Sequence, residues 1–320
     1  MDTEQASPRY ADIDLWSSAD ILHAMIEGQM AAVAAVRAAL PAIEQAALAT
    51  EARLREGGRL IYVGAGTSGR LAVQDGAELI PTFNWPKDRL LLLMAGGKDA
   101  LLRSAENAED EIGQAHATIR EHEIAAPDVL IAVAASGTTP FTLTCLREAK
   151  SRGALTIGIA NNRDTPILNE ADHPIWLDTG PEPIAGSTRM KAGTAQRAAL
   201  NALSSLVMIR LGHVHQGLMV DVQAINAKLQ RRSEHILLRL TGRTPEQVRV
   251  ALEQANGSVK LAVLLLHGCN LKEASDALVR AGGRLRTALE GLGSRAAVPE
   301  LLTIDEELSP DAQDRHRGSQ

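Results

Sequence analysis

Five short, uninterrupted apolar runs constrain the fold of this chain more than any other feature of its sequence. They cover residues 60–63, 90–94, 129–133, 156–159 and 175–177. Because apolar and polar residues do not alternate within them, the runs are typical of strands buried on both faces, as in a parallel sheet covered by helices. Helices are expected at 68–79, 99–121, 140–152, 165–170 and 188–211. The alternation of predicted strands and helices along the chain predicts an α/β fold with a doubly wound, parallel five-stranded sheet flanked by helices.

The character of the sequence changes along the chain and predicts four segments. Residues 1–57 are expected to form an N-terminal arm and a helical segment, and residues 58–225 the α/β domain. Residues 226–303 have helical spacing interrupted by glycines, which predicts a C-terminal helical subdomain. Residues 304–320 are polar and acidic, and we expect a flexible tail there.

Composition argues against two classes of partner. A net charge of −6 and an aromatic content of 2% disfavour nucleic-acid binding, which uses basic surfaces and aromatic stacking. Residues 1–5 are too polar for a signal peptide, and the apolar residues 261–267 are too few to span a bilayer. The two cysteines, Cys145 and Cys269, imply no disulfide framework. We therefore expect a cytoplasmic protein with no nucleic-acid and no membrane partner.

Three loops rich in glycine and hydroxyl groups are the candidate functional sites. Two follow the first and third apolar runs, at residues 64–69 and 136–139, and the third, at 186–194, opens the last predicted helix of the α/β domain. Ligands of doubly wound sheets bind beyond the carboxyl ends of the strands, where helix starts offer unpaired N–H groups to an anion. Ser and Thr at a helix start can also be simple N-caps. Three such loops on consecutive α/β units favour a cage for a phosphate monoester.

The glycines of the first loop also have the G-x-G-x-x-G spacing of dinucleotide-binding proteins. The second apolar run, however, ends in Ala95-Gly96-Gly97, without the acidic residue that would hold a ribose. Lys191 is expected in a first helical turn, where the helix dipole disfavours a cation unless an anion is near. The candidate phosphate ligands are Gly66, Thr67, Ser68, Ser136, Gly137, Thr138, Thr139, Ser187 and Lys191.

The same loops and their flanks resemble a known family. Residues 64–71, 135–137, 139–140 and 186–196 are similar to the N-acetylmuramic acid 6-phosphate etherases, which carry a sugar isomerase (SIS) domain. The resemblance covers roughly residues 10–290 and implies that residues 58–225 are an SIS sugar-phosphate-binding domain. It implies a lyase that splits the D-lactyl ether of N-acetylmuramic acid 6-phosphate during recycling of cell-wall sugars in a bacterial cytoplasm. It also implies a homodimer and neither a metal nor an organic cofactor.

The resemblance further implies two catalytic carboxylates. Glu78 aligns with the family's proton donor, and Glu109 aligns with its second acid/base residue. The reaction needs a base to remove the proton on C2 of the open-chain sugar and an acid to protonate the departing lactyl oxygen. Two carboxylates with separated pKa values can divide these roles.

The position of Glu78 sets a geometric problem. It lies ten residues past Ser68, so a continuous helix would hold it about 15 Å from the first loop. Either the helix ends early, near Gly76, or a glutamate comes from a partner chain. We favour the second solution, a composite active site at a dimer interface.

Two other functions stay open. An aldose–ketose sugar-phosphate isomerase on the same fold would also move the C2 proton but would release no lactate. A non-catalytic sugar-phosphate sensor would leave its ligand unchanged, and a transcriptional regulator of this kind would carry a basic helix-turn-helix domain, which the residues before Arg59 do not resemble. The spacing of His, Cys, Asp and Glu predicts no metal site.

Overall fold

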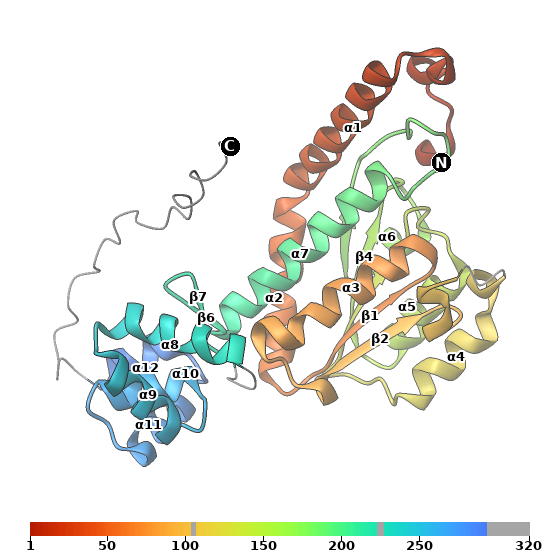
Figure 1. The fold of residues 1–320 in the computed structure, drawn as a ribbon. Coiled ribbons are helices and arrows are strands. Elements are labelled where there is room, and N and C mark those ends of the chain that lie inside the picture. The colour runs from red at the N-terminus through yellow and green to blue at the C-terminus, as the bar shows by residue number, and fades with distance from the viewer. Residues whose placement is uncertain (104–106, 223–226, 293–320) are drawn as a thin grey trace, which may run out of the picture. The chain divides into compact units, whose positions relative to one another are not determined.

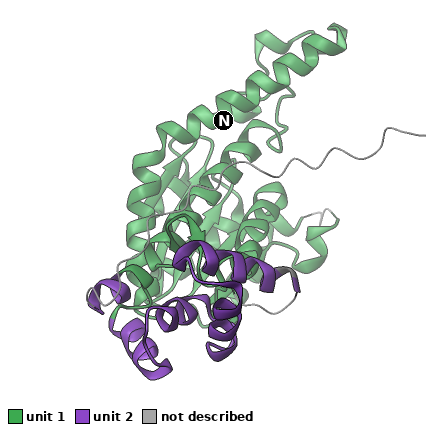
Figure 2. Cartoon of the chain, turned by 60° about the vertical axis from the view of Figure 1, so that its left-hand side comes forward, with its two compact units in different colours: residues 1–222, 281–286 green, residues 223–280, 287–320 purple. Residues whose placement is uncertain are grey.

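The computed structural model describes residues 1–103, 107–222 and 227–292. The described residues form two compact units, residues 1–222 with 281–286 and residues 227–280 with 287–292 (Figure 2). Residues 1–57 belong to the same unit as the sheet. The predicted tail at 304–320 lies outside the described residues. The four-segment division stays a prediction.

The first unit is built on the predicted five-stranded parallel sheet, with strand order β2-β1-β3-β4-β5 (Figure 1). The strands are β1 (Leu60–Gly64), β2 (Leu90–Met94), β3 (Val129–Val133), β4 (Leu155–Ala160) and β5 (His173–Trp176). Gly64 at the end of β1 pairs with Val133 at the end of β3. The loops after these two strands therefore begin at the same level. They do so where the strand order reverses, which is the usual ligand position in such sheets.

Helices cover both faces of the sheet, as predicted (Figure 1). They are α1 (Ser18–Ala38), α2 (Leu40–Arg55), α3 (Gly66–Phe83), α4 (Ile112–Glu121), α5 (Pro140–Ser151), α6 (Pro166–Glu170) and α7 (Lys191–Leu211). Leu60 and Tyr62 of β1 join the core beneath α2, α3 and α7, whereas Ile61 and Val63 join the core beneath α4 and α5. This alternation follows from the two-residue period of a strand and explains why the runs are apolar throughout.

Two predicted helices are shorter than expected. Among the described residues of the predicted helix 99–121, only α4 is α-helical, and it is preceded by two 3-10 turns, Lys98–Leu101 and Ala108–Asp110. Asn107, within the predicted range, has a left-handed φ of 65°, which a continuous helix does not allow. The helix predicted from 188 begins only at Lys191.

Helix α3 does not end near Gly76, which corrects one of the two expectations for that helix. It continues to Phe83, and Gly76 serves the packing of the helix on the sheet. A Cβ atom at Gly76 would lie 2.5 Å from Cδ2 of Leu92 and 3.0 Å from the ring of Tyr62. Only glycine allows this close approach.

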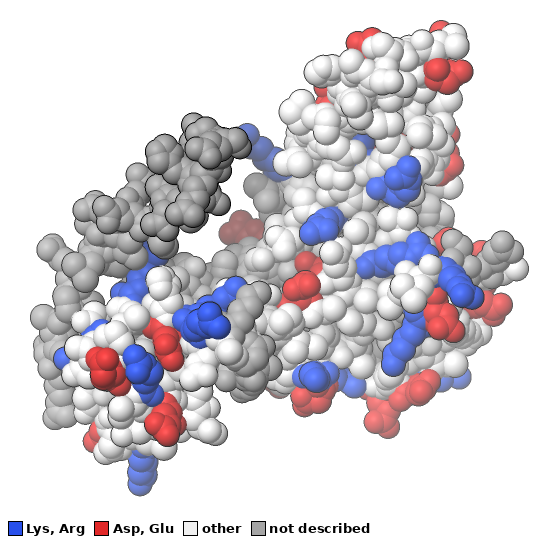
Figure 3. Space-filling model, in the orientation of Figure 1, with Lys and Arg blue, Asp and Glu red and all other residues white. Residues whose placement is uncertain are grey.

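Helix α1 carries an exposed apolar stripe formed by Leu22, Ile26, Met30 and Val33. The surface over α1 in Figure 3 shows few charged side chains. By length and hydropathy alone, α1 is the one helix of the described chain that could cross a membrane. A core helix passes the same test, and α1 packs on α7. The expectation of no membrane partner stays a prediction.

The remaining elements are short or belong to the C-terminal region. Before α1 lie three 3-10 turns, Asp2–Glu4, Pro8–Tyr10 and Ile13–Leu15, and another at Lys87–Arg89 precedes β2. A small hairpin consists of β6 (Val214–His215) and β7 (Leu218–Met219). The later helices are α8 (Ala227–Thr241), α9 (Pro245–Gln254), α10 (Val259–Leu266), α11 (Leu271–Arg280) and α12 (Leu285–Gly291).

After α11 the chain returns to the first unit at residues 281–286. There Arg284 pairs with Glu51 of α2 at 3.1 Å. Arg55 and Arg210 pair with the same carboxylate, which is only 8% exposed. Arg284 thus joins Arg55 and Arg210 around one nearly buried carboxylate, and its ion pair holds the returning segment on α2.

Candidate active site at the carboxyl edge of the sheet

The first loop presents unpaired backbone N–H groups at the start of α3. Gly66 begins the helix with a left-handed φ of 53°, and no side chain of the described chain caps it. Gly64 and Gly69 touch through their backbones, since a Cβ at Gly69 would lie 2.7 Å from the carbonyl oxygen of Gly64. The glycine spacing therefore produces a tight turn whose first N–H groups, together with the helix dipole, suit an anion.

Glu109 lies directly against this loop. A Cβ atom placed on Gly66 would be 2.8 Å from Oε1 of Glu109. The 3-10 turn that carries Glu109 is anchored by Ala108, which is buried in the core under α4 and α5. The structure thus brings a carboxylate and the first loop together, although the helix predicted for this segment is absent.

The second loop, residues 136–139, precedes α5. The backbone N–H of Thr138 donates to Oγ of Ser136 at 3.2 Å, and the hydroxyl groups of Ser136 and Thr139 are 3.3 Å apart. Gly137 has a φ of 69° and packs so closely on the side chain of Thr165 that a Cβ would clash at 2.2 Å. Because β1 and β3 are neighbours in register, this loop and the first loop flank the same point of the sheet.

The third loop lies beside the first. A Cβ at Gly193 of α7 would be 3.7 Å from the methyl group of Thr67 and 3.3 Å from the carbonyl oxygen of Thr188. Ser187 is half-buried in the turn that precedes α7. Residues of all three predicted loops therefore lie at one edge of the sheet.

Lys191 and the N-terminus of α7 have partners that the sequence did not reveal. The carboxylate of Glu182, which is 1% exposed, accepts hydrogen bonds from the backbone N–H groups of Lys191 and Ala192, both at 2.9 Å. The Nζ of Lys191 donates to the carbonyl oxygen of Thr179 at 2.7 Å, and burial lowers the pKa of this ammonium group. These N–H groups are occupied by Glu182, so α7 differs from α3. Phosphate binding by Lys191 stays a prediction.

Glu78 is not brought to the loops by its own chain. It is exposed on α3, twelve residues past Gly66, which corresponds to about 18 Å along a continuous helix. Glu109, in contrast, touches Gly66. The two glutamates of one chain are therefore not assembled around the same loop.

Sequence reasoning also missed Asn162 and Thr3, which lie at the same edge. Asn162 follows β4, and its Nδ2 donates to the carbonyl oxygen of Ala135 at 2.8 Å and to Oγ1 of Thr3 at 2.9 Å. An asparagine after a strand is ordinary in sequence, and its partner is 159 residues away. No local spacing could have indicated the pair.

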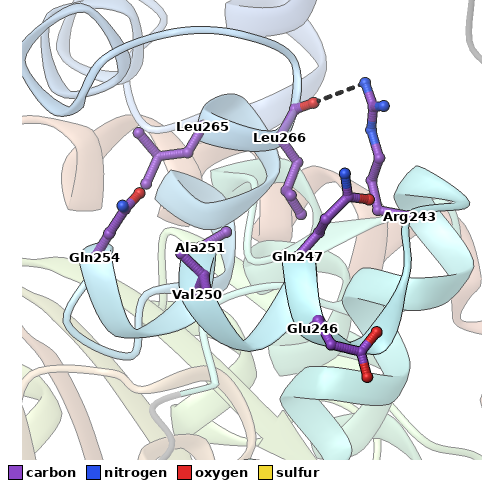
Figure 4. Close-up of a pocket in the computed structure, with 8 residues that line it drawn as sticks. All are labelled: Arg243, Glu246, Gln247, Val250, Ala251, Gln254, Leu265 and Leu266. Atoms are coloured by element: carbon purple, nitrogen blue, oxygen red, sulfur yellow. Dashed lines mark hydrogen bonds between the residues drawn. The ribbon is translucent and has the colours of Figure 1, made fainter.

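A hollow in the second unit, between α9 and α10, lacks the hydroxyl groups of the loop site (Figure 4). Its lining residues are Arg243, Glu246, Gln247, Val250, Ala251, Gln254, Leu265 and Leu266. Over the described part of the chain, no group of three or more His, Cys, Asp or Glu side chains is placed to hold a metal ion.

A doubly wound sheet with hydroxyl-bearing loops at its switch point defines an SIS-type α/β protein. Family models agree: the SIS domain matches residues 111–206, and the glucokinase regulatory protein N-terminal SIS domain matches residues 42–150. Among curated relatives, the N-acetylmuramic acid 6-phosphate etherase of Deinococcus radiodurans is 48% identical, over 92% of this chain and 98% of that protein.

Two further relatives bear the same name. The proteins of Streptomyces coelicolor and Geobacillus thermodenitrificans are 44% and 43% identical, each over 90% of this chain and over 93% and 98% of their own lengths. The chain belongs to the N-acetylmuramic acid 6-phosphate etherase family, which confirms the resemblance found in its loops.

Proposed function

We propose that this protein is a carbon–oxygen lyase that cleaves the D-lactyl ether of N-acetylmuramic acid 6-phosphate. The products are N-acetylglucosamine 6-phosphate and D-lactate. The observation that carries the proposal is the seat of Glu109 against Gly66. A carboxylate at this position repels a bound phosphate, so it does not serve to bind the phosphate. It can instead act as an acid or base on the sugar carbons beside the phosphate.

The phosphate is held by the first and second loops. The N–H groups at the start of α3 and the hydroxyl groups of Ser136 and Thr139 supply donors without a basic field, in keeping with the net charge of −6. Hydrogen bonds within the second loop fix the position of these hydroxyl groups before the ligand binds.

The reaction proceeds on the open-chain sugar, whose aldehyde acidifies the proton on C2. A carboxylate removes this proton, the C2–C3 double bond forms, and the C3–O bond breaks. The departing lactate oxygen takes a proton from an acid. Water then adds its hydroxyl group to C3 and a proton to C2. Glu109 carries out one of these two proton transfers, and a second carboxylate carries out the other.

The second carboxylate is Glu78 of another copy of the chain, in a cytoplasmic homodimer. The exposure of Glu78 and its separation from the loops of its own chain support this arrangement. The apolar stripe on α1 supports self-association, since exposed apolar patches of this kind mark interaction surfaces.

Mixing inactive Glu78→Ala and Glu109→Ala chains tests the composite site. Random pairing makes half of the dimers mixed, and each mixed dimer has one intact site, so about a quarter of the wild-type rate should return. A mixture as inactive as its components would contradict the shared site.

Incubation with N-acetylmuramic acid 6-phosphate and an assay for D-lactate tests the reaction itself. The match of residues 42–150 to the SIS domain of a glucokinase regulatory protein favours one other candidate, a non-catalytic sugar-phosphate sensor. A sensor would bind the sugar phosphate and release no lactate. An isomerase would convert it without lactate release.

A further inference from the structure

The N-terminal arm is anchored at the candidate active site. Thr3 is completely buried (0% exposed), although it stands in the polar N-terminal segment of the chain. Burial of a polar residue costs free energy unless its groups are hydrogen-bonded, so its partners define what the arm is for.

Thr3 is bonded through all its polar groups to the loops at the carboxyl edge of the sheet. Its N–H donates to Oδ1 of Asn162 at 3.2 Å, and its Oγ1 accepts from Nδ2 of the same residue at 2.9 Å. Its carbonyl oxygen accepts from the N–H of Gly186, in the third loop, at 3.1 Å. Asn162 in turn holds Ala135, just before the second loop. The arm is thus fixed to two of the three predicted loops.

This anchor places the next residue, Glu4, on the third loop. A Cβ at Gly186 would lie 2.9 Å from Oε2 of Glu4, so the carboxylate occupies the space that any larger residue would fill. Gly186 has a φ of 75°, which also favours glycine. Glu4 is exposed, and no hydrogen bond or ion pair from the described chain uses its carboxylate. The backbone at Glu4 is therefore fixed by the hydrogen bonds of Thr3, while the Glu4 carboxylate remains available to a ligand.

We propose that Glu4 is a substrate-binding residue that contacts the neutral part of the sugar. The inference rests on the proposed function. The substrate has two anionic groups, the phosphate and the lactyl carboxylate, and a glutamate repels both. A carboxylate only accepts hydrogen bonds, so Glu4 pairs with the N–H of the acetamido group or with a sugar hydroxyl group.

Steady-state D-lactate release by Glu4→Ala, Glu4→Gln and Gln5→Ala variants tests this role, with thermal unfolding as a check on the fold. Loss of one charge-assisted hydrogen bond should raise KM about tenfold in Glu4→Ala and less in Glu4→Gln. Gln5 is exposed and adjacent, so its variant is the matched control and should behave as wild type. Wild-type KM and kcat in Glu4→Ala would overturn the proposal.

Calorimetry with two probes separates a role in binding from damage to the loops. N-acetylglucosamine 6-phosphate should bind Glu4→Ala about tenfold more weakly, whereas inorganic phosphate should bind as it does to wild type. An equal loss for both probes would overturn the proposal, because it would mean that the phosphate loops had moved. Wild-type protein that binds the sugar phosphate through Glu4 but releases no lactate would refute the lyase and leave the role of Glu4 intact.

Discussion

The cap that Glu182 forms on α7 makes a quantitative prediction for stability. Glu182→Gln keeps the shape of the side chain but removes its charge and turns one acceptor oxygen into a donor. One of the two N–H groups that now bond at 2.9 Å would then face an amide NH2 group inside a buried site. An unsatisfied buried donor costs about 1–3 kcal/mol, and the lost interaction with the helix dipole adds about 0.5–1 kcal/mol. The expected loss is about 1.5–4 kcal/mol.

Urea unfolding followed by tryptophan fluorescence measures this loss. All three tryptophans of the chain, Trp16, Trp85 and Trp176, lie in the first unit, so the signal reports on the unit that contains α7. The midpoint should fall while the slope of free energy against urea stays constant.

Glu44→Gln is the matched control for the change of charge. Glu44 is exposed on α2, so its variant should stay within about 0.5 kcal/mol of wild type. A Glu182→Gln variant that is equally close to wild type would refute the cap as a stabilising contact, whatever the control does.

Three further changes have distinct outcomes. Gly66→Ala should lower the rate of D-lactate release by more than about tenfold, because it strains a φ of 53° and displaces the Glu109 carboxylate. Its control is Gly113→Ala, in open space on α4, which should be neutral or should stabilise the fold by up to about 1 kcal/mol. Burial raises the pKa of Asp75, so its contribution to stability is greatest below its unfolded pKa and is lost as pH rises through the raised value; Asp75→Asn should remove this part of the pH dependence in urea titrations. Burial acts to raise the pKa of Glu51, but its hydrogen bonds to arginines lower it overall, so its stabilisation is lost as pH falls through the folded value; Glu51→Gln should flatten that acid limb, and an unchanged limb would contradict the assignment.

The sheet and two of the site's loops could be predicted because their signals are local. An uninterrupted apolar run reports burial on both faces, and a glycine next to hydroxyl residues reports a tight turn at a strand end. The helix predicted across 99–121 failed because Asn107 takes a left-handed conformation, which sequence permits without requiring. That failure matters for the site, since the resulting turn is what delivers Glu109 to Gly66.

The rest of the site depends on pairs of residues that are distant in sequence. Glu182 caps a helix that starts nine residues later, and the proline-flanked segment around it has no capping-box spacing. Thr3 and Asn162 are separated by 159 residues. Neither pair has a periodic or motif signature, so only the folded chain identifies them.

The pairing of Arg284 with Glu51 ties residues 281–286 to the first unit, so residues 227–280 lie between two stretches of chain that belong to that unit. A segment that is attached to a folded unit at both ends cannot let those ends diffuse apart when the segment unfolds. The entropy cost of closing such a loop rises only slowly with its length. Truncation before residue 281 would therefore do more than delete helices. It would also remove Arg284, one of the guanidinium partners of Glu51, and with it the ion pair that joins residues 281–286 to α2.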